Sequence, residues 1–362
     1  MAVTSYSASD DRVQKLWSKK VQTEALISSD FGRFCDTSDS ALGMIFEETS
    51  KDAGDQVRFP LVNLLEGDGT TENETLEGNE EAITSHTDTL VINKLRHATR
   101  AEVTITDQRI PWDLGAQHAR LLTLWWKERF DTIVANHLCG YNLETRGKYV
   151  GFNAVNAPSS GRIIRANGTD DDSLSSSHVF TLSLIDQARE LATTGGSSGL
   201  PPIRPIKASM AGGGSNDMYV SFLHPTQVTS IRTTSSNNVW RDIQLNLLAG
   251  GYDKASNPIF NRALGVYGDT ILIESKYMRG GITNAGAAKA NTRRAVFAGA
   301  HAISLAFGKG YSKDAGKVRD ETFDYGDQYA KSLTNVFGLK ATRFNSNDYG
   351  KIVISTYAAD AA

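Results

Sequence analysis

The chain has 362 residues, 40% of them hydrophobic and 22% charged, so it is long enough and apolar enough to fold around a sizeable core. Its formal net charge of -3 excludes the strongly basic proteins whose main task is to bind nucleic acid. The two cysteines, Cys35 and Cys139, lie far apart and form no CxxC pair, so we expect neither a zinc ribbon nor a redox motif but two small buried residues. No run of about 18 apolar residues is present, so we expect no membrane span.

The first 55 residues predict an N-terminal arm with one short amphipathic helix. The pattern breaks at Phe31-Gly32 and at the Ser/Asp cluster 36–40. Because such an arm is half apolar but has little regular structure, it needs another surface, and in an assembling protein a neighbouring subunit can provide it. Apolar residues at helical spacing carry the helix prediction: Leu16, Trp17, Val21, Ala25 and Leu26.

Two β-rich alternating runs, 56–65 and 87–95, predict the strands of one long hairpin. Pro60 inside the first run points to an edge strand. The connection between the runs is long and has no lysine or arginine. It is either a solvated acidic loop or an arm that reaches over a neighbour's basic surface, where a set of ion pairs fixes register and partner choice. Its acidic residues are Glu66, Asp68, Glu72, Glu74, Glu77, Glu80 and Glu81.

The clearest predicted element is a helix over 111–140. Pro111 suits the first helical turn, Asp113 favours the positive end of the helix dipole, and Gly140 is a natural stop. Such a helix is about 40 Å long at 1.5 Å per residue.

The remaining chain predicts an α+β fold, without the regular strand-helix alternation of a parallel sheet. A second helix is expected over 178–193, followed by a mobile Gly/Ser/Pro-rich connection at 195–216. Further strands are expected at 218–223, 270–274, 294–297 and 350–356, and further helical stretches near 225–233, 238–249 and 300–307.

An ordered set of strings resembles the major capsid proteins of tailed bacteriophages with the Hong Kong 97-type fold. The set begins with DQVRFPLV, TLEGNEEAI, RHATR and QRIPWDL between residues 55 and 114. It continues with MYVSFLHPTQVTSIRT, VWRDIQ, NPIFNRALGVYGDTILIES, RRAVFAGAHAISLAFGKG and NVFGLKATRFNSNDYGKIVISTYA between residues 218 and 358. Each string is weak alone, but their order covers nearly the whole chain.

The resemblance implies a division of the chain and a set of contacts. The parts would be an N-terminal arm (1–55), an extended loop (56–97), a spine helix with a peripheral domain (98–209), an axial domain (210–315) and a return to the peripheral domain (316–362). Trp17, Arg96, Arg100 and the seven acidic loop residues are then the expected inter-subunit contacts.

The resemblance also implies a function: self-assembly into pentamers and hexamers of an icosahedral shell around phage double-stranded DNA. Expected partners are further copies of the chain, a separate scaffolding protein, a portal protein, a decoration protein and packaged DNA by weak non-specific contact. The location would be the virion capsid, assembled in the host cytoplasm. An encapsulin-like bacterial compartment shell is the alternative. Some proteins of this fold cross-link a loop lysine to a neighbour's asparagine, but no lysine lies between Arg58 and Lys94, so no such cross-link is expected.

Catalytic and cofactor signals are weak, and we expect no enzyme activity, no cofactor and no metal site. Residues 195–199 fit G-x-S-x-G around Ser197, but a helix precedes them where the nucleophile elbow needs a strand. His118 and His137 are expected to make packing or polar contacts, and His224 to start a helix. The acidic run 170–172 lacks the glycine and later glutamate of a calcium loop.

Overall fold

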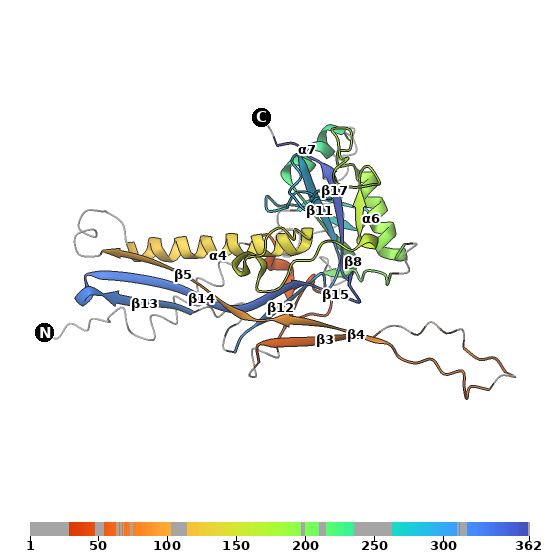
Figure 1. Ribbon diagram of the computed structural model, residues 1–362, viewed down its shortest axis with the longest axis horizontal. Coiled ribbons are helices and arrows are strands. Elements are labelled where there is room, and N and C mark those ends of the chain that lie inside the picture. Colours follow the sequence, from red (N-terminus) through yellow and green to blue (C-terminus); the bar gives the residue numbers. More distant parts are fainter. Residues whose placement is uncertain are drawn as a thin grey trace.

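Two β-sheets and one long helix organise the chain in the computed structural model (Figure 1). The structure describes residues 29–47, 54–62, 65, 67, 69–72, 75–102, 114–196, 200–209, 215–234, 263–309, 311 and 317–360.

The first sheet has six strands and is built around β14, the longest strand. One edge of β14 pairs with β5 over ten residues, and its other edge pairs with β13 and then with β12. The parallel strands β2 and β1 extend the sheet beyond β12. The strand bounds are β1 Cys35–Asp36, β2 Gly43–Phe46, β5 Asn93–Glu102, β12 Ile303–Phe307, β13 Lys317–Phe323 and β14 Gln328–Ala341.

One face of this sheet is covered by the long helix α4, Leu114–Cys139. Its buried residues pack on the sheet, and the Trp126 ring meets Phe337 of β14 edge-on at 5.2 Å. The helix ends where the sequence predicts, because Gly140 has a φ of 61° and a Cβ there would lie 2.6 Å from Pro158. The predicted long helix is therefore confirmed over its described residues.

The second sheet has seven strands in the order β6-β17-β11-β8-β10-β9, with β7 paired to β8. Helix α6 (Leu182–Thr194) packs on it through a second core that includes Phe180, Ile185, Leu272 and Ile354. The strand bounds are β6 Ile163–Arg165, β7 Ile206–Ser209, β8 Ser215–Leu223, β9 Ala263–Tyr267, β10 Thr270–Glu274, β11 Thr292–Ala298 and β17 Lys351–Tyr357.

Helix α7, Pro225–Thr234, begins directly after His224, which confirms the predicted helix-start role of that histidine. The His224 Nδ1 accepts a hydrogen bond from the Thr226 backbone N–H at 3.3 Å and lies 2.8 Å from the Thr226 hydroxyl. Short elements complete the chain: η1 Gly32–Phe34, α5 Gly147–Val150, η2 Ser160–Arg162, η4 Asp324–Gly326, β15 Arg343–Phe344 and β16 Asn347–Asp348.

Two buried cations join the end of α4 to the second sheet. Lys351 of β17 donates to the carbonyl oxygens of His137 and Leu138 at 2.5 and 3.2 Å. Arg294 of β11 donates to the Cys139 carbonyl at 3.1 Å and pairs with buried Asp171 at 2.7 Å. Because the carboxyl end of a helix carries unpaired carbonyls and partial negative charge, these cations fix α4 against the sheet.

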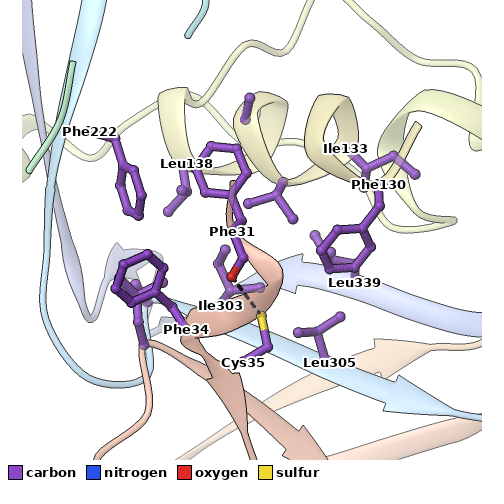
Figure 2. Close-up of a cluster of buried hydrophobic side chains, with 14 of the residues drawn as sticks. Phe31, Phe34, Cys35, Phe130, Ile133, Leu138, Phe222, Ile303, Leu305 and Leu339 are labelled. Atoms are coloured by element: carbon purple, nitrogen blue, oxygen red, sulfur yellow. Dashed lines mark hydrogen bonds between the residues drawn. The ribbon is translucent and has the colours of Figure 1, made fainter. Parts of the chain in front are cut away.

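The described part of the predicted arm differs from the expectation of a segment with little structure of its own. Residues 29–46 contribute β1 and β2 to the six-stranded sheet. Phe31, fully buried, lies beneath α4 with Phe34 and Cys35, and its ring centroid is 4.8 Å from that of Phe222 (Figure 2). This segment therefore packs inside its own chain, because Phe31 and Phe34 supply apolar surface that the core of the same chain buries.

Two further expectations need correction. The stretch 300–307 contains strand β12, not a helix, and β12 lies in the six-stranded sheet. The segment 195–216 is not only a connection, because β7 lies within it and Ile203 and Ile206 are buried. The seven-stranded sheet takes strands from inside 210–315 and also β6, β7 and β17 from outside it, and the division of the chain into domains stays a prediction. The stretch 238–249 lies outside the described residues.

Candidate assembly surfaces

The predicted hairpin is present and crosses the face of the six-stranded sheet that α4 leaves open. Strand β3 (Gln56–Val62) pairs antiparallel with β4 (Ser85–Val91). Val57, Phe59 and Leu90 bury their side chains in a small third core. Gly338 of β14 permits the close approach, since a Cβ there would meet the Val91 carbonyl oxygen at 2.2 Å. The second predicted strand, 87–95, is interrupted at Ile92, where the chain passes from β4 to β5.

Beyond β3 and β4 the described residues between 65 and 84 run far out from the body as an extended loop (Figure 1). The four acidic loop residues that the structure describes, Glu72, Glu77, Glu80 and Glu81, are exposed. Glu81 accepts a hydrogen bond from the Gly67 backbone N–H at 2.8 Å, which ties one limb to the other. Glu66, Asp68 and Glu74 lie outside the described residues, as does Trp17.

Large apolar side chains are also exposed on and beside this loop. The exposed fractions are 59% for Val62, 64% for Leu65, 64% for Leu76 and 71% for Ile83. The contacts predicted from the sequence do not include these apolar residues, because the loop prediction rests on its acidic residues. The sequence does contain an indication of them: aliphatic residues within a segment that is too long and too polar to form a core of its own. Several exposed aliphatic residues on one projection are typical of a surface that binds another molecule.

A basic face lies on the outer side of β5, β14 and β13, away from α4. Thr334 of β14 pairs with Arg96 of β5 on one side and with Lys317 of β13 on the other. In the same way, Ala330 of β14 lies between Arg100 of β5 and Glu321 of β13. Successive side chains of a strand point to opposite faces of the sheet, so cationic residues that are two positions apart in a strand lie on the same face. Arg100 also stacks on the Phe323 ring at 4.3 Å. The exposed cations of this basic face are Lys94, Arg96, Arg100, Lys317 and Arg319.

The loop and the basic face belong to different ends of the molecule. In Figure 1 the loop extends from the β3–β4 end, whereas β13 and the far end of β5 lie at the opposite end. The structure thus gathers Arg96 and Arg100 on one surface with three further cations, and holds the acidic residues on a separate projection.

The family comparison identifies what kind of protein carries these surfaces. A family model described as "Phage capsid protein" matches residues 4–360. The chain belongs to this phage capsid protein family.

Individual relatives of this capsid protein agree with the family. The major capsid protein of Pseudomonas phage KPP25 is 22% identical over 391 residues, with 98% of this chain and 97% of that protein covered. The capsid of Ralstonia phage GP4 is similar along the whole of both chains, with a TM-score of 0.80 and 27% identity. The Cyanophage Pam1 capsid also matches over both full chains, with a TM-score of 0.68 and 19% identity. The Hong Kong 97-type fold expected from the sequence is confirmed, and the family match favours a phage shell over the encapsulin-like alternative.

Two candidate residues, His137 and Asp171, have partners within the capsid protein's own fold. Buried His137 lies with Nε2 2.9 Å from the Val150 carbonyl oxygen, and burial lowers its pKa to about 4. Asp171 pairs with Arg294 and, at 3.1 Å, with Arg165. Burial, the largest influence, raises the pKa of Asp171, but the Arg294 charge and the hydrogen bonds from Arg294 and the Ile282 backbone together lower it by more, so the net shift is downward. Ser197 lies outside the described residues.

The described residues of the capsid protein hold no group of three or more His, Cys, Asp or Glu side chains arranged to bind a metal ion. Across the same ranges, no helix has the length and apolar character needed to cross a membrane. Cys35 and Cys139 are both buried, as expected, and they form no disulfide with each other.

Proposed function

We propose that this chain is a major capsid protein whose copies form pentamers and hexamers of an icosahedral shell enclosing phage double-stranded DNA. The observation that carries the proposal is the extended loop with its exposed Leu65, Leu76 and Ile83, in a chain of the phage capsid family. Burial of these side chains against a second copy stabilises the association by about 25 cal/mol per Å² of apolar surface removed from water. The protein acts by association and not by catalysis.

The loop of one copy is proposed to lie over the basic face of the next copy. Glu72, Glu77 and Glu80 on the loop then approach Arg96 and Arg100. Each exposed ion pair contributes at most about 1 kcal/mol, so the apolar residues supply most of the affinity. The set of charges instead selects the register and the partner, because a shifted loop would place like charges together.

The proposal includes further partners. Besides other copies of the chain, these are a separate scaffolding protein during assembly, a portal protein, a decoration protein and packaged DNA held by weak non-specific contact. Assembly takes place in the host cytoplasm, and the product is the virion capsid. The net charge of -3 supports weak rather than tight contact with DNA.

Electron microscopy of the overexpressed protein, with and without its candidate scaffolding protein, tests the shell function. We expect closed icosahedral particles when the scaffold is present. A protein that stays monomeric under both conditions contradicts the proposal. Particles that contain cargo protein instead of nucleic acid after phage infection would support the encapsulin-like alternative.

A further inference from the structure

The turn between β13 and β14 presents a fully exposed aromatic ring. This acidic turn consists of Asp324, Tyr325, Gly326 and Asp327, and its backbone closes with a 3.0 Å hydrogen bond from the Asp327 N–H to the Asp324 carbonyl. Tyr325 has an exposed fraction of 111%, the largest among the exposed large hydrophobic residues that the structure describes.

Tyr325 also occupies an unfavourable backbone conformation. Its φ of 51° and ψ of 26° are left-handed, and Gly326 follows with a φ of 95°, as in a type I′ turn. Asparagine or glycine is the usual first central residue of such a turn. A side chain with a normal Cβ costs about 1 kcal/mol or more there. The folded chain gains no burial from the tyrosine ring, so intramolecular stability does not account for it.

A groove elsewhere on the chain has the complementary chemistry. It has a volume of about 520 Å³ and runs along β3, which among the described strands pairs only with β4. Aromatic rings line it: Phe46 and Phe59 stack at 4.6 Å between centroids, and Phe344 meets Phe59 edge-on at 5.9 Å. The aromatic lining suits an inserted aromatic ring, which prefers offset or edge-to-face neighbours.

The lining of this groove is also basic. Arg58 and Arg204 are both exposed there, and His301 lies among the lining residues. The acidic residue in the lining, Asp39, is paired with Arg204 at 3.1 Å and lies 3.3 Å from the His301 Nε2. The cationic side chains are thus in excess, which suits an aromatic residue flanked by carboxylates.

The acidic turn cannot reach the groove of its own chain. The turn directly precedes Gln328, the first residue of β14, and the groove-lining residue Thr342 directly follows Ala341, the last. A strand of 14 residues is about 45 Å long at about 3.3 Å per residue. In Figure 1 the turn accordingly lies at one end of the long sheet and β3 near the other.

We propose that Tyr325 of one copy inserts into the groove along β3 of a second copy, with Asp324 and Asp327 directed toward Arg58 and Arg204. The inference rests on the proposed shell function and names one of its contacts. Because the turn and the groove are different surfaces, the contact is heterologous and repeats from copy to copy, as ring and shell assembly require.

Replacing Tyr325 separates this contact from folding. The Tyr325→Asn variant creates an Asn-Gly turn, so we expect its thermal unfolding midpoint to equal or exceed that of the wild type. We expect the protein concentration needed for assembly to rise at least tenfold, measured by light scattering and electron microscopy. Tyr325→Phe keeps the ring and should assemble like the wild type.

A charge exchange tests the direction of the contact. Arg58→Glu should raise the assembly concentration, and adding Asp324→Lys in the same chain should restore it at least partly. Arg232→Glu, an exposed change on α7, is the matched control and should have little effect. If Tyr325→Asn assembles at the wild-type concentration, or if Asp324→Lys gives no rescue, the inference is overturned while the shell function stands. If the wild-type protein itself forms no shells, the proposed function fails instead.

Discussion

Buried charge distinguishes a few residues from the rest of this chain. Asp131 of α4 is fully buried and accepts hydrogen bonds from the Ser29 hydroxyl and, at 3.3 Å, from the Asp30 backbone N–H. Asp30 is itself buried, and Ser275 donates to its carboxylate at 3.1 Å. This site joins the first described residues of the chain to α4 and to the loop after β10, so its protonation affects how firmly that segment is held.

Replacing Asp131 with asparagine should stabilise the protein at high pH. Burial raises the pKa of Asp131 to about 6, and the nearby Asp30 charge adds to this, while Ser29 and Lys127 act in the opposite direction. A carboxyl whose folded pKa lies above its ordinary value binds more protons when folded, so its contribution to stability is lost as pH rises through about 6. We expect Asp131→Asn to gain about 1 kcal/mol at pH 8 and to lose this advantage at pH 5.

Thermal unfolding of the unassembled protein between pH 5 and pH 8 checks this expectation. The wild type should lose stability on going from pH 5 to pH 8, and the variant should lose less. An unchanged pH dependence in Asp131→Asn would show that Asp131 does not titrate in this range.

Replacing Lys351, which contacts the carboxyl end of α4, should strongly destabilise the protein. It is 1% exposed, donates to two helix-end carbonyls and lies 3.8 Å from buried Asp348. Lys351→Met fills similar space but leaves the carbonyls and the Asp348 charge without this partner, so we expect a loss of about 3 kcal/mol in the free energy of unfolding. Urea denaturation measures it, with the exposed Lys148→Met as a control expected to change stability by less than about 0.5 kcal/mol.

At the scale of elements, the extended loop should recognise a neighbour by charge. We expect a triple Glu72→Lys, Glu77→Lys, Glu80→Lys variant to fold normally, because these side chains are exposed on a loop outside the cores. Its assembly should be impaired, since lysines would then face the basic face of the next copy. Adding Arg96→Glu and Arg100→Glu should restore assembly in part. Particle yield by sedimentation measures both effects, and restoration by Arg232→Glu alone would argue against this pairing.

Elements with a clear hydrophobic periodicity are the ones that the sequence predicts correctly. The α4 helix and the β3–β4 hairpin have clear helical and alternating patterns, and both are present. The sequence does not predict strand β12, because all five of its residues are buried, and a short apolar run buried on both faces has no alternating pattern. The sequence does not predict the pairing of the described arm residues either, because β2 is a short strand whose partner, β12, lies more than 250 residues away.

The candidate surfaces were only partly predictable for a geometric reason. The acidic loop is one continuous segment, so its charge is visible in the sequence. The basic face is assembled from alternate residues of β5 and β13, which lie more than 200 residues apart and meet only through their shared pairing with β14. The groove along β3 likewise combines Asp39, Arg58, Arg204 and His301 from four separate segments. The sequence predicts Arg96 and Arg100 as contact residues, but it does not show that Lys317 and Arg319 lie on the same surface.

At the scale of the whole molecule, the shape suits contacts with several neighbours at once. The loop and the acidic turn lie at opposite ends of the molecule (Figure 1). The basic face and the groove lie on the same outer side of the six-stranded sheet. Because a projection lies at each end, each copy can bind one neighbour through a projection and be bound by the projection of another. A shell built this way has many modest contacts per subunit, so its stability depends on their number and on apolar burial more than on any single ion pair.

Such a shell should come apart without breaking covalent bonds. Between Arg58 and Lys94 the sequence has no lysine, so the loop cannot supply the amine for an isopeptide bond to a neighbour's asparagine. Cys35 and Cys139 are both buried, so we expect no disulfide between copies either. We expect assembled particles boiled in detergent to run as a single band at the monomer mass, 39.3 kDa. A ladder of multiples that persists under reducing conditions would reveal a covalent link, and mass spectrometry of the joined peptides would then identify the lysine that makes it.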